Sequence, residues 1–205
     1  MTNMDALERA LANPNPGTDP TLPEIAPAAA AASLLDVAYA TLDSPLGTLL
    51  LAATPQGLVR LAYIAGDWEE DDVLTRLATK LSPRILAAPR RLDQPRRELE
   101  RYFTGALRRF ETPLDWRLTA GFGRRVLQAT ARIPFGSRST YMRVAAQAGS
   151  PRASRAAGNA LGSNPIPIIV PCHRVLHTGG GLGGYTGGLD RKRLLLEIES
   201  GQQRM

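Results

Sequence analysis

The sequence predicts an α+β fold, in which a small N-terminal α/β domain precedes a mainly α-helical domain that contains a helix-turn-helix. In the first half, short apolar runs of strand length are separated by Pro-Leu-Gly and Pro-Gln-Gly turns, and helical patterns follow them. In the second half the helical period prevails, and acidic residues are missing between Trp116 and Leu189. These changes place the domains at residues 34–115 and 116–205, within a chain long enough for a proper core.

The N-terminal elements follow from these patterns. Residues 1–33 are predicted to form a disordered tail, because Asn13–Gly17 and the prolines after it are incompatible with regular structure. Strand-like runs predict strands at Val37–Leu42, Thr48–Ala53 and Leu58–Ile64. Helical patterns predict helices at about Glu70–Leu81 and Pro95–Leu107, before a domain edge around Pro113–Leu118.

The C-terminal half is predicted to be built from short helices. The first covers Phe122–Ile133 and the second covers Tyr141–Ala148. Ser150 is a suitable N-cap with Pro151 at the first helical position, so a third helix is expected from there to about Leu161. The last two helices and their turn form a helix-turn-helix pattern, which any two packed helices also show.

The third of these helices has almost no large side chains apart from two arginines and Asn159. Its small residues are Ala153, Ser154, Ala156, Ala157, Gly158 and Ala160. Such a surface allows another helix to pack closely. It also allows close approach to the minor groove of DNA, which is only about 6 Å wide. The sequence pattern alone leaves both explanations open.

Charge favours the second explanation. The net charge of +6 is unevenly spread, because the part before Trp116 has sixteen acidic and twelve basic residues. From Trp116 to Leu189 the basic residues are arginines without any acid: Arg117, Arg124, Arg125, Arg132, Arg138, Arg143, Arg152, Arg155 and Arg174. An arginine-rich composition would explain arginine in place of lysine but not the missing acids. The second domain is therefore expected to bind a polyanion such as nucleic acid.

Several classes of protein are excluded by composition. A run of about 18 apolar residues and a secretory leader pattern are both absent from the sequence, so a cytoplasmic protein without a membrane span is expected. A single cysteine excludes an intramolecular disulfide. One cysteine and two histidines fall short of a tetrahedral zinc set, so we expect no metal.

The one cysteine, Cys172, lies in the segment Ile168–Val175 directly before a histidine. A single thiol often packs as a small hydrophobic side chain. However, His173 and Arg174 are groups that lower the pKa of a thiol from about 8.5 toward neutrality. Three prolines around the segment indicate a rigid, irregular backbone that presents the thiol. Because a second cysteine is absent from the sequence, a nucleophile is expected rather than a redox pair.

The glycine-rich segment Gly179–Gly188 contains a G-x-G-x-x-G pattern, with Glu199 twenty residues further on. A dinucleotide site would also need a preceding strand and a βαβ unit of about 30 residues, and the printed sequence ends at Met205. We therefore reject a dinucleotide site. The segment is expected to be a loop with few side chains, and a terminal helix is expected from about Asp190.

Five sequence blocks in order resemble the O6-alkylguanine-DNA alkyltransferases, the methylated-DNA–protein-cysteine methyltransferases. These blocks are Arg155–Gly158, Asn164-Pro165, Pro171–Val175, Gly184–Gly188 and Leu195-Leu196 with Glu199. The resemblance covers about Phe122 to Glu199 and continues more weakly at Ser44–Gly47. It implies a ribonuclease H-like N-terminal domain and a winged-helix-like C-terminal domain. It also implies a monomer without a cofactor, which repairs O6-alkylguanine, and O4-alkylthymine as well, in duplex DNA.

The resemblance implies a role for each catalytic residue. Cys172 would accept the alkyl group irreversibly, so that one molecule repairs one lesion. Glu199 would orient His173, which would act on the thiol through a water, as in other nucleophile–base–orienter sets. Asn164 would brace the segment, although an Asn-Pro turn starter has the same geometry. Tyr141 would protonate the leaving base. His177 lies outside the matched blocks and is expected on a surface loop.

The resemblance also implies a DNA surface and a base pocket. The nucleotide would be flipped out of the duplex, and Arg155 would fill the space it leaves in the stack. The expected DNA-contacting residues are Arg155, Tyr141, Ala153, Ser154 and Gly158, with Arg124 and Arg125 on phosphates. The expected pocket residues are Val175, Tyr185, Thr186, Leu161 and Gly183. Within the pocket, the Val175 and Cys172 carbonyls would meet the guanine amine, and Tyr185 and the Thr186 amide the O6 side.

Some positions depart from the family pattern. Gly123 and Leu127 replace the usual Gln and Trp, which affects local packing. Leu161 replaces a longer residue of some relatives, so the tolerance of bulky adducts stays open. Two other functions would require different sequence features. A non-catalytic alkyltransferase-like protein would lack Cys172, and a thiol hydrolase would not need Arg155 or the acid-free half.

Overall fold

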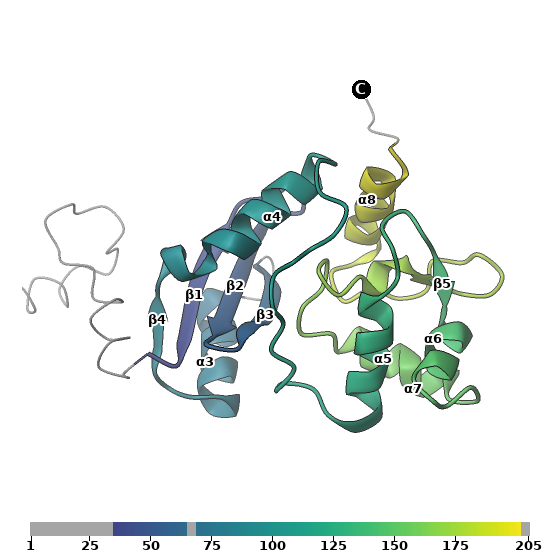
Figure 1. Ribbon diagram of the computed structural model, residues 1–205, viewed down its shortest axis with the longest axis horizontal. Coiled ribbons are helices and arrows are strands. Elements are labelled where there is room, and N and C mark those ends of the chain that lie inside the picture. Colours follow the sequence, from purple (N-terminus) through teal and green to yellow (C-terminus); the bar gives the residue numbers. More distant parts are fainter. Residues whose placement is uncertain (1–34, 65–68, 202–205) are drawn as a thin grey trace, which may run out of the picture. The chain divides into compact units, whose positions relative to one another are not determined.

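The computed structural model describes residues 35–64 and 69–201, and residues from Asp36 onward belong to one compact unit. Its sheet has the order β3-β2-β1-β4 (Figure 1). The strands are β1 (Val37–Leu42), β2 (Thr48–Thr54), β3 (Gly57–Ile64) and β4 (Ile85–Ala87). The first three are antiparallel, and β4 pairs in parallel with β1.

Helices account for most of the remaining structure. The α-helices are α3 (Glu70–Lys80), α4 (Asp93–Phe103), α5 (Gly121–Ala131), α6 (Tyr141–Gln147), α7 (Ser154–Gly162) and α8 (Leu189–Ser200). Two 3₁₀ turns cover Pro89–Leu92 and Cys172–Arg174, and β5 (Ser139–Thr140) pairs in parallel with β6 (Val175–Leu176). The predicted α+β fold, with a sheet in the first half and helices in the second, is confirmed.

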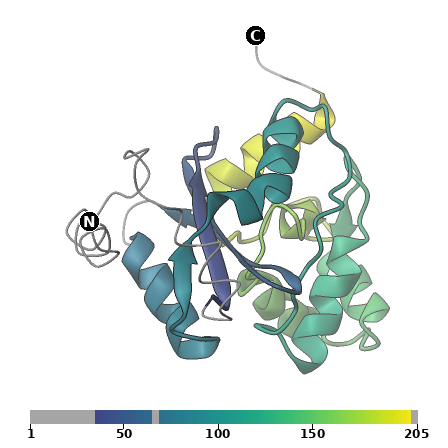
Figure 2. The ribbon, with the colours of Figure 1, turned by 60° about the vertical axis from the view of Figure 1, so that its left-hand side comes forward.

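Both faces of the sheet are buried, because apolar side chains alternate between its two faces along the strands. In β2, Leu49 and Leu51 join one apolar cluster, whereas Leu50 and Ala52 join the other. Successive side chains of a strand point to opposite faces, so a continuous apolar run is typical of a strand covered on both sides. Helix α3 covers one of these faces, as the two views in Figures 1 and 2 show.

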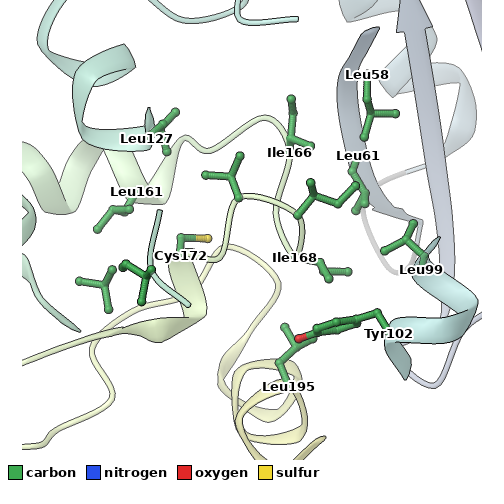
Figure 3. Packing of buried hydrophobic residues seen from close by; sticks show 14 of the residues in the cluster. Leu58, Leu61, Leu99, Tyr102, Leu127, Leu161, Ile166, Ile168, Cys172 and Leu195 are labelled. Atoms are coloured by element: carbon green, nitrogen blue, oxygen red, sulfur yellow. The ribbon is translucent and has the colours of Figure 1, made fainter. Parts of the chain in front are cut away.

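The other face of the sheet shares its core with the C-terminal half. Figure 3 shows this cluster, which includes Leu58, Leu61, Leu99, Tyr102, Leu127, Leu161, Ile166, Ile168, Cys172 and Leu195. The backbone is also joined there, because the amide of Leu61 in β3 donates to the carbonyl of Pro165 at 2.9 Å. The segment that carries Cys172 therefore packs against the edge strand of the sheet. Residues on both sides of the predicted boundary at 115/116 contribute to one core.

Some predicted elements differ from the structure. Helix α7 begins at Ser154 with Ala153 as its N-cap residue, so the predicted cap at Ser150 is wrong. The Ser150 amide bonds to Ala145 and its carbonyl accepts from Ala153, which makes a turn after α6. Helix α4 ends at Phe103, four residues before the predicted end. Strands β4, β5 and β6 were not predicted, because two or three residues show no periodicity.

The predicted tail, residues 1–33, lies outside the described residues. Between residues 35 and 201, leaving out 65–68, the structure contains no helix with the length and apolarity required to span a bilayer.

Candidate active site

Cys172 begins the 3₁₀ turn that follows Pro171, and its side chain is 5% exposed. The segment before it is irregular, and Ile168 has a positive φ of 72°. This conformation is a strained one for a β-branched residue, costing on the order of 1–3 kcal/mol. The core around Ile168 is fully buried and holds the backbone in this conformation.

Asn164 ties this segment together. Its Nδ2 donates to the Val170 carbonyl at 2.8 Å and lies 3.1 Å from the Cys172 Sγ. Its Oδ1 accepts from the Ile166 amide at 3.0 Å. Asn164 is buried, so these contacts satisfy both ends of an amide that water does not reach. They also fix the position of the sulfur.

A second set of hydrogen bonds joins His173 to the terminal helix. The His173 Nε2 lies 2.8 Å from the Glu199 Oε1, and both side chains are fully buried. A carboxylate only accepts hydrogen bonds, so Nε2 carries the proton and Nδ1 keeps its lone pair. Nδ1 has no hydrogen-bond partner among the described residues, so it does not bond directly to Cys172. The imidazole is therefore oriented by Glu199 and has one basic nitrogen available.

The Glu199 carboxylate is surrounded by donors. Arg174 donates to it through Nε and Nη2, and the Tyr102 hydroxyl donates to Oε1 at 2.8 Å. Arg138 lies 3.3 Å from Oε2. Burial alone would raise the pKa of Glu199, but hydrogen bonds from His173 and Arg174 outweigh it and lower the pKa from 4.5 to about 2. Glu199 is therefore a permanent anion near neutral pH.

The thiol does not have the cationic neighbours that the sequence predicted. Arg174 pairs with Glu199 instead, and burial raises the pKa of Cys172. The hydrogen bond from Asn164 and the charge of Lys192 offset this rise only in part. Burial also lowers the pKa of His173, although Glu199 opposes this. The resting pair is therefore a neutral thiol and a neutral imidazole, rather than a preformed thiolate.

Tyr141 lies at the start of α6 and is packed between two glycines. Its ring is 3.7 Å from the position that a Cβ on Gly158 would take. A Cβ on Gly183, whose φ is +67°, would collide with the Tyr141 hydroxyl. His177 is exposed, as expected, and its ring lies 5.1 Å from that of Tyr141. Burial and then the charge of Cys172 raise the pKa of Tyr141, so its hydroxyl keeps its proton.

Tyr185 is held by a residue of the N-terminal sheet that sequence reasoning missed. Its hydroxyl lies 2.7 Å from that of Tyr63 in β3, and its ring stands edge-on to His173 at 6.4 Å. Arg191 covers the Tyr63 ring at 4.7 Å, and a Cβ on Gly187 would collide with both tyrosines. Only the described tertiary structure brings residues 63 and 185 together, so no local signal could have found this pair.

The other predicted pocket residues lie around the same segment. The Val175 carbonyl accepts from Lys192 Nζ at 2.9 Å, and the Cys172 carbonyl accepts from the Val175 amide. Each carbonyl keeps a second lone pair. The Thr186 hydroxyl donates to the Gly162 carbonyl at 2.6 Å, next to the buried Leu161. Lys192, which is buried at this point, was not predicted from the sequence.

The nine arginines of the acid-free segment divide into three groups. Arg124 donates to the carbonyls of Thr119 and Trp116, and Arg125 Nε donates to that of Ala148. Arg117, Arg138 and Arg174 pair with carboxylates. Within residues 35–64 and 69–201, no side-chain hydrogen bond or ion pair is formed by the remaining four, which are Arg132, Arg143, Arg152 and Arg155. Arg155 is exposed near the start of α7, next to Ala153 and Ser154.

The described residues contain no group of three or more histidine, cysteine, aspartate or glutamate side chains that could hold a metal ion.

Comparisons with known protein families match most of the chain. Residues 37–116 match the ribonuclease-like domain of 6-O-methylguanine DNA methyltransferase. Residues 121–201 match the DNA-binding domain of the same family. The first match ends two residues after Leu114, which forms an isolated bridge with Leu58, and the segment that carries Cys172 lies with α8 in the second match.

Individual relatives agree with these matches. The methylated-DNA–protein-cysteine methyltransferase of Mycobacterium tuberculosis is 43% identical over 161 residues, 78% of this chain and 91% of the relative. The constitutive enzyme of the same name from Bacillus subtilis is 36% identical, over 78% of this chain and 94% of the relative. A crystal structure of the M. tuberculosis protein OGT in complex with DNA is 38% identical, with a TM-score of 0.69 over 80% of this chain and 94% of that chain.

Proposed function

Because the chain belongs to the 6-O-methylguanine DNA methyltransferase family, with its DNA-repair and methylated-DNA–protein-cysteine methyltransferase activity, we propose that Cys172 is the alkyl acceptor. The observation that carries this proposal is the buried set of contacts from Asn164 to the Cys172 Sγ and from His173 to Glu199. Intact-mass measurement after incubation with alkylated duplex DNA tests it, because adduct size, stoichiometry and site are read together.

The thiol is activated when it gives its proton to His173. The lone pair on Nδ1 is the acceptor, reached through a bridging water, and the resulting imidazolium is stabilised by Glu199. Asn164 and the charge of Lys192 stabilise the thiolate, since both lower the pKa of Cys172 against the effect of burial. Burial keeps the thiol protonated at rest, so the thiolate is formed only when His173 takes the proton.

Transfer is then a single displacement. The Cys172 sulfur forms a bond to the alkyl carbon, and the bond between that carbon and guanine O6 breaks with its electron pair leaving on the base. Tyr141 is protonated at rest because its pKa is raised, and it gives this proton only to the basic anion of the leaving guanine before it is reprotonated from solvent. The thioether is a poor leaving group, so the product is permanent and each molecule acts once.

The base reaches this buried sulfur only if it leaves the duplex. We assign α7 to the minor groove, where its small residues permit close approach, and Arg155 to the vacated stack. Tyr185 and the Thr186 amide then line the O6 side of the base, and Gly183 leaves room beside Tyr141. O6-alkylguanine, and with it O4-alkylthymine, is the substrate class proposed, and the protein acts as a monomer.

Arg124 and Arg125 remain proposed phosphate contacts. Their hydrogen bonds to main-chain carbonyls brace the start of α5 and the end of α6. Substituting them would therefore disturb the fold as well as DNA binding, which makes them poor tests of the DNA surface.

Arg155→Ala is expected to slow repair of a paired lesion in duplex DNA by roughly tenfold or more, because extrusion of a stacked base costs a few kcal/mol. Reaction with free O6-benzylguanine should be unchanged, since a free base needs no flipping. Single-turnover rates on both substrates measure the difference. Arg152→Ala, at an exposed arginine of the preceding turn, is the matched control. Equal losses on both substrates would place Arg155 in the pocket or the fold.

Tyr63→Phe is expected to slow transfer about fivefold on duplex DNA and on the free base alike. It removes one hydrogen bond to Tyr185, worth about 1 kcal/mol, while the ring under Arg191 stays. The melting temperature should hardly change. Tyr39→Phe, on the opposite face of the sheet, is the control. A large fall in melting temperature, or an effect on duplex DNA alone, would contradict a positioning role for Tyr63.

A further inference from the structure

A polar cavity lies at the end of α5 and is not used by the proposed chemistry. Its volume is about 560 Å³, within the range of small-ligand sites. The residues that line it come from α5, β5, α6 and the loop between them: Ala129, Arg132, Ile133, Pro134, Ser137, Arg138, Ser139, Arg143 and Gln147. The lining residues therefore include three arginines, whose guanidinium groups carry positive charge, and no aspartate or glutamate.

Two of these guanidinium groups are unused. Arg132 and Arg143 are exposed, and neither side chain makes a hydrogen bond or ion pair within the described part of the chain. Arg138 takes part in both sites: it lines the cavity, and it also bonds to Glu199 and to the Leu196 carbonyl. Guanidinium groups placed together without an anion repel one another, whereas a bound phosphate would accept bidentate hydrogen bonds from them.

An independent observation is the side chain of Ser139 in the wall of the cavity. The residue is 7% exposed, and its Oγ has no hydrogen-bond partner among the residues that the structure describes. A buried hydroxyl without a partner is costly, and such groups call for a specific explanation. The Oγ is closed off from solvent in this structure, so a bound oxyanion would accept from it after the side chain turns toward the cavity. Carbonyl groups that would repel an anion are already bonded, since those of Ala129 and Thr130 accept from main-chain amides and that of Ile133 from Arg174.

The cavity faces away from the helix proposed to bind the lesion. Tyr141 packs against Gly158 of α7. Arg143 follows two residues later, which is roughly 200° further round α6. A phosphate bound by Arg143 is therefore not one that α7 reaches at the flipped nucleotide.

We propose that this arginine-lined cavity binds a phosphate group. The chemistry of the site accommodates free phosphate or a backbone phosphate of a DNA segment other than the one held by α7. The cavity needs neither Cys172 nor the base pocket, so the inference does not depend on alkyl transfer. Only the choice of a DNA phosphate rests on the proposed function.

The first test is a titration of the full chain with inorganic phosphate at constant ionic strength, followed by NMR of the arginine Nε–Hε groups. Signals of Arg132 and Arg143 should shift saturably in the millimolar range or below. The double variant R132Q/R143Q should lose the saturable shift of Arg138. R109Q, at an exposed arginine outside the cavity, should keep all three responses. Arg138 itself is left intact because it touches Glu199.

The second test identifies the source of the phosphate. If the cavity holds a DNA phosphate, R132Q/R143Q should flatten the dependence of log affinity on log salt by about 0.9 for unmodified duplex DNA. An unchanged slope, with the phosphate titration positive, assigns the site to free phosphate. Reaction with O6-benzylguanine should be wild-type in either case, so a failure of the alkyl-transfer proposal is seen separately. The proposal is overturned if the cavity arginines respond no more than Arg109 does, or only linearly.

Discussion

Cys172→Ser is expected to abolish alkyl transfer completely while lesion binding is retained. A serine hydroxyl is a far weaker nucleophile than a thiolate, and the neutral His173 does not ionise it. In the wild-type protein, intact mass should show a plateau at one methyl group per molecule under excess alkylated duplex, with the added mass on Cys172. Peptide mapping locates the adduct, and a gel-shift assay of Cys172→Ser measures binding.

Asn164→Ala provides a graded comparison for this experiment. It removes the Nδ2 contact to the sulfur and the bond to the Val170 carbonyl, so transfer should be slowed without loss of the one-to-one end point. Repeated turnover by the wild-type protein would contradict the single-use acceptor and favour a thiol hydrolase. Full transfer by Cys172→Ser would place the acceptor elsewhere.

Glu199→Gln is expected to destabilise the fold by about 3–5 kcal/mol, because it leaves the buried Arg174 without its counterion. The melting temperature should fall on the order of 10 °C. Transfer should also slow at temperatures where the variant is folded, since a neutral amide stabilises an imidazolium less than a carboxylate does. Glu197→Gln, on the same helix but only partly buried, is the control and should leave both properties unchanged.

The lowered pKa of Glu199 predicts that the free energy of unfolding falls in acid. The pKa of Glu199 is lowered to about 2 in the folded protein, so the unfolded chain binds more protons between pH 4.5 and pH 2. The contribution of Glu199 is complete above pH 4.5 and is lost as the pH falls to about 2, amounting to about 3 kcal/mol. Urea unfolding at several pH values measures this loss. Equal acid sensitivity in wild type and Glu199→Gln would show that Glu199 is not the group responsible.

Local sequence was sufficient where a short segment determines its own structure. The strand Val37–Leu42 has its predicted bounds, because its apolar residues and flanking turn act within a few residues. Asn164 contacts the sulfur only eight residues away, but its bracing role was implied by the family resemblance, because local sequence indicated no more than an Asn-Pro turn. The acid-free stretch of arginines was also visible in the sequence. The roles assigned to His173, Tyr141 and Glu199, by contrast, came from the family resemblance.

Tertiary structure decided what each charged or polar group contacts. Arg174 was expected to act on the neighbouring thiol, but it pairs with Glu199, twenty-five residues further on, and Lys192 lies near the thiol instead. Tyr63 joins Tyr185 across 122 residues of sequence. Periodicity reports which face of an element is buried, but not which other element covers it. A long side chain finds its partner only after distant elements have packed, so the pKa values and the shape of the site depend on the assembled fold.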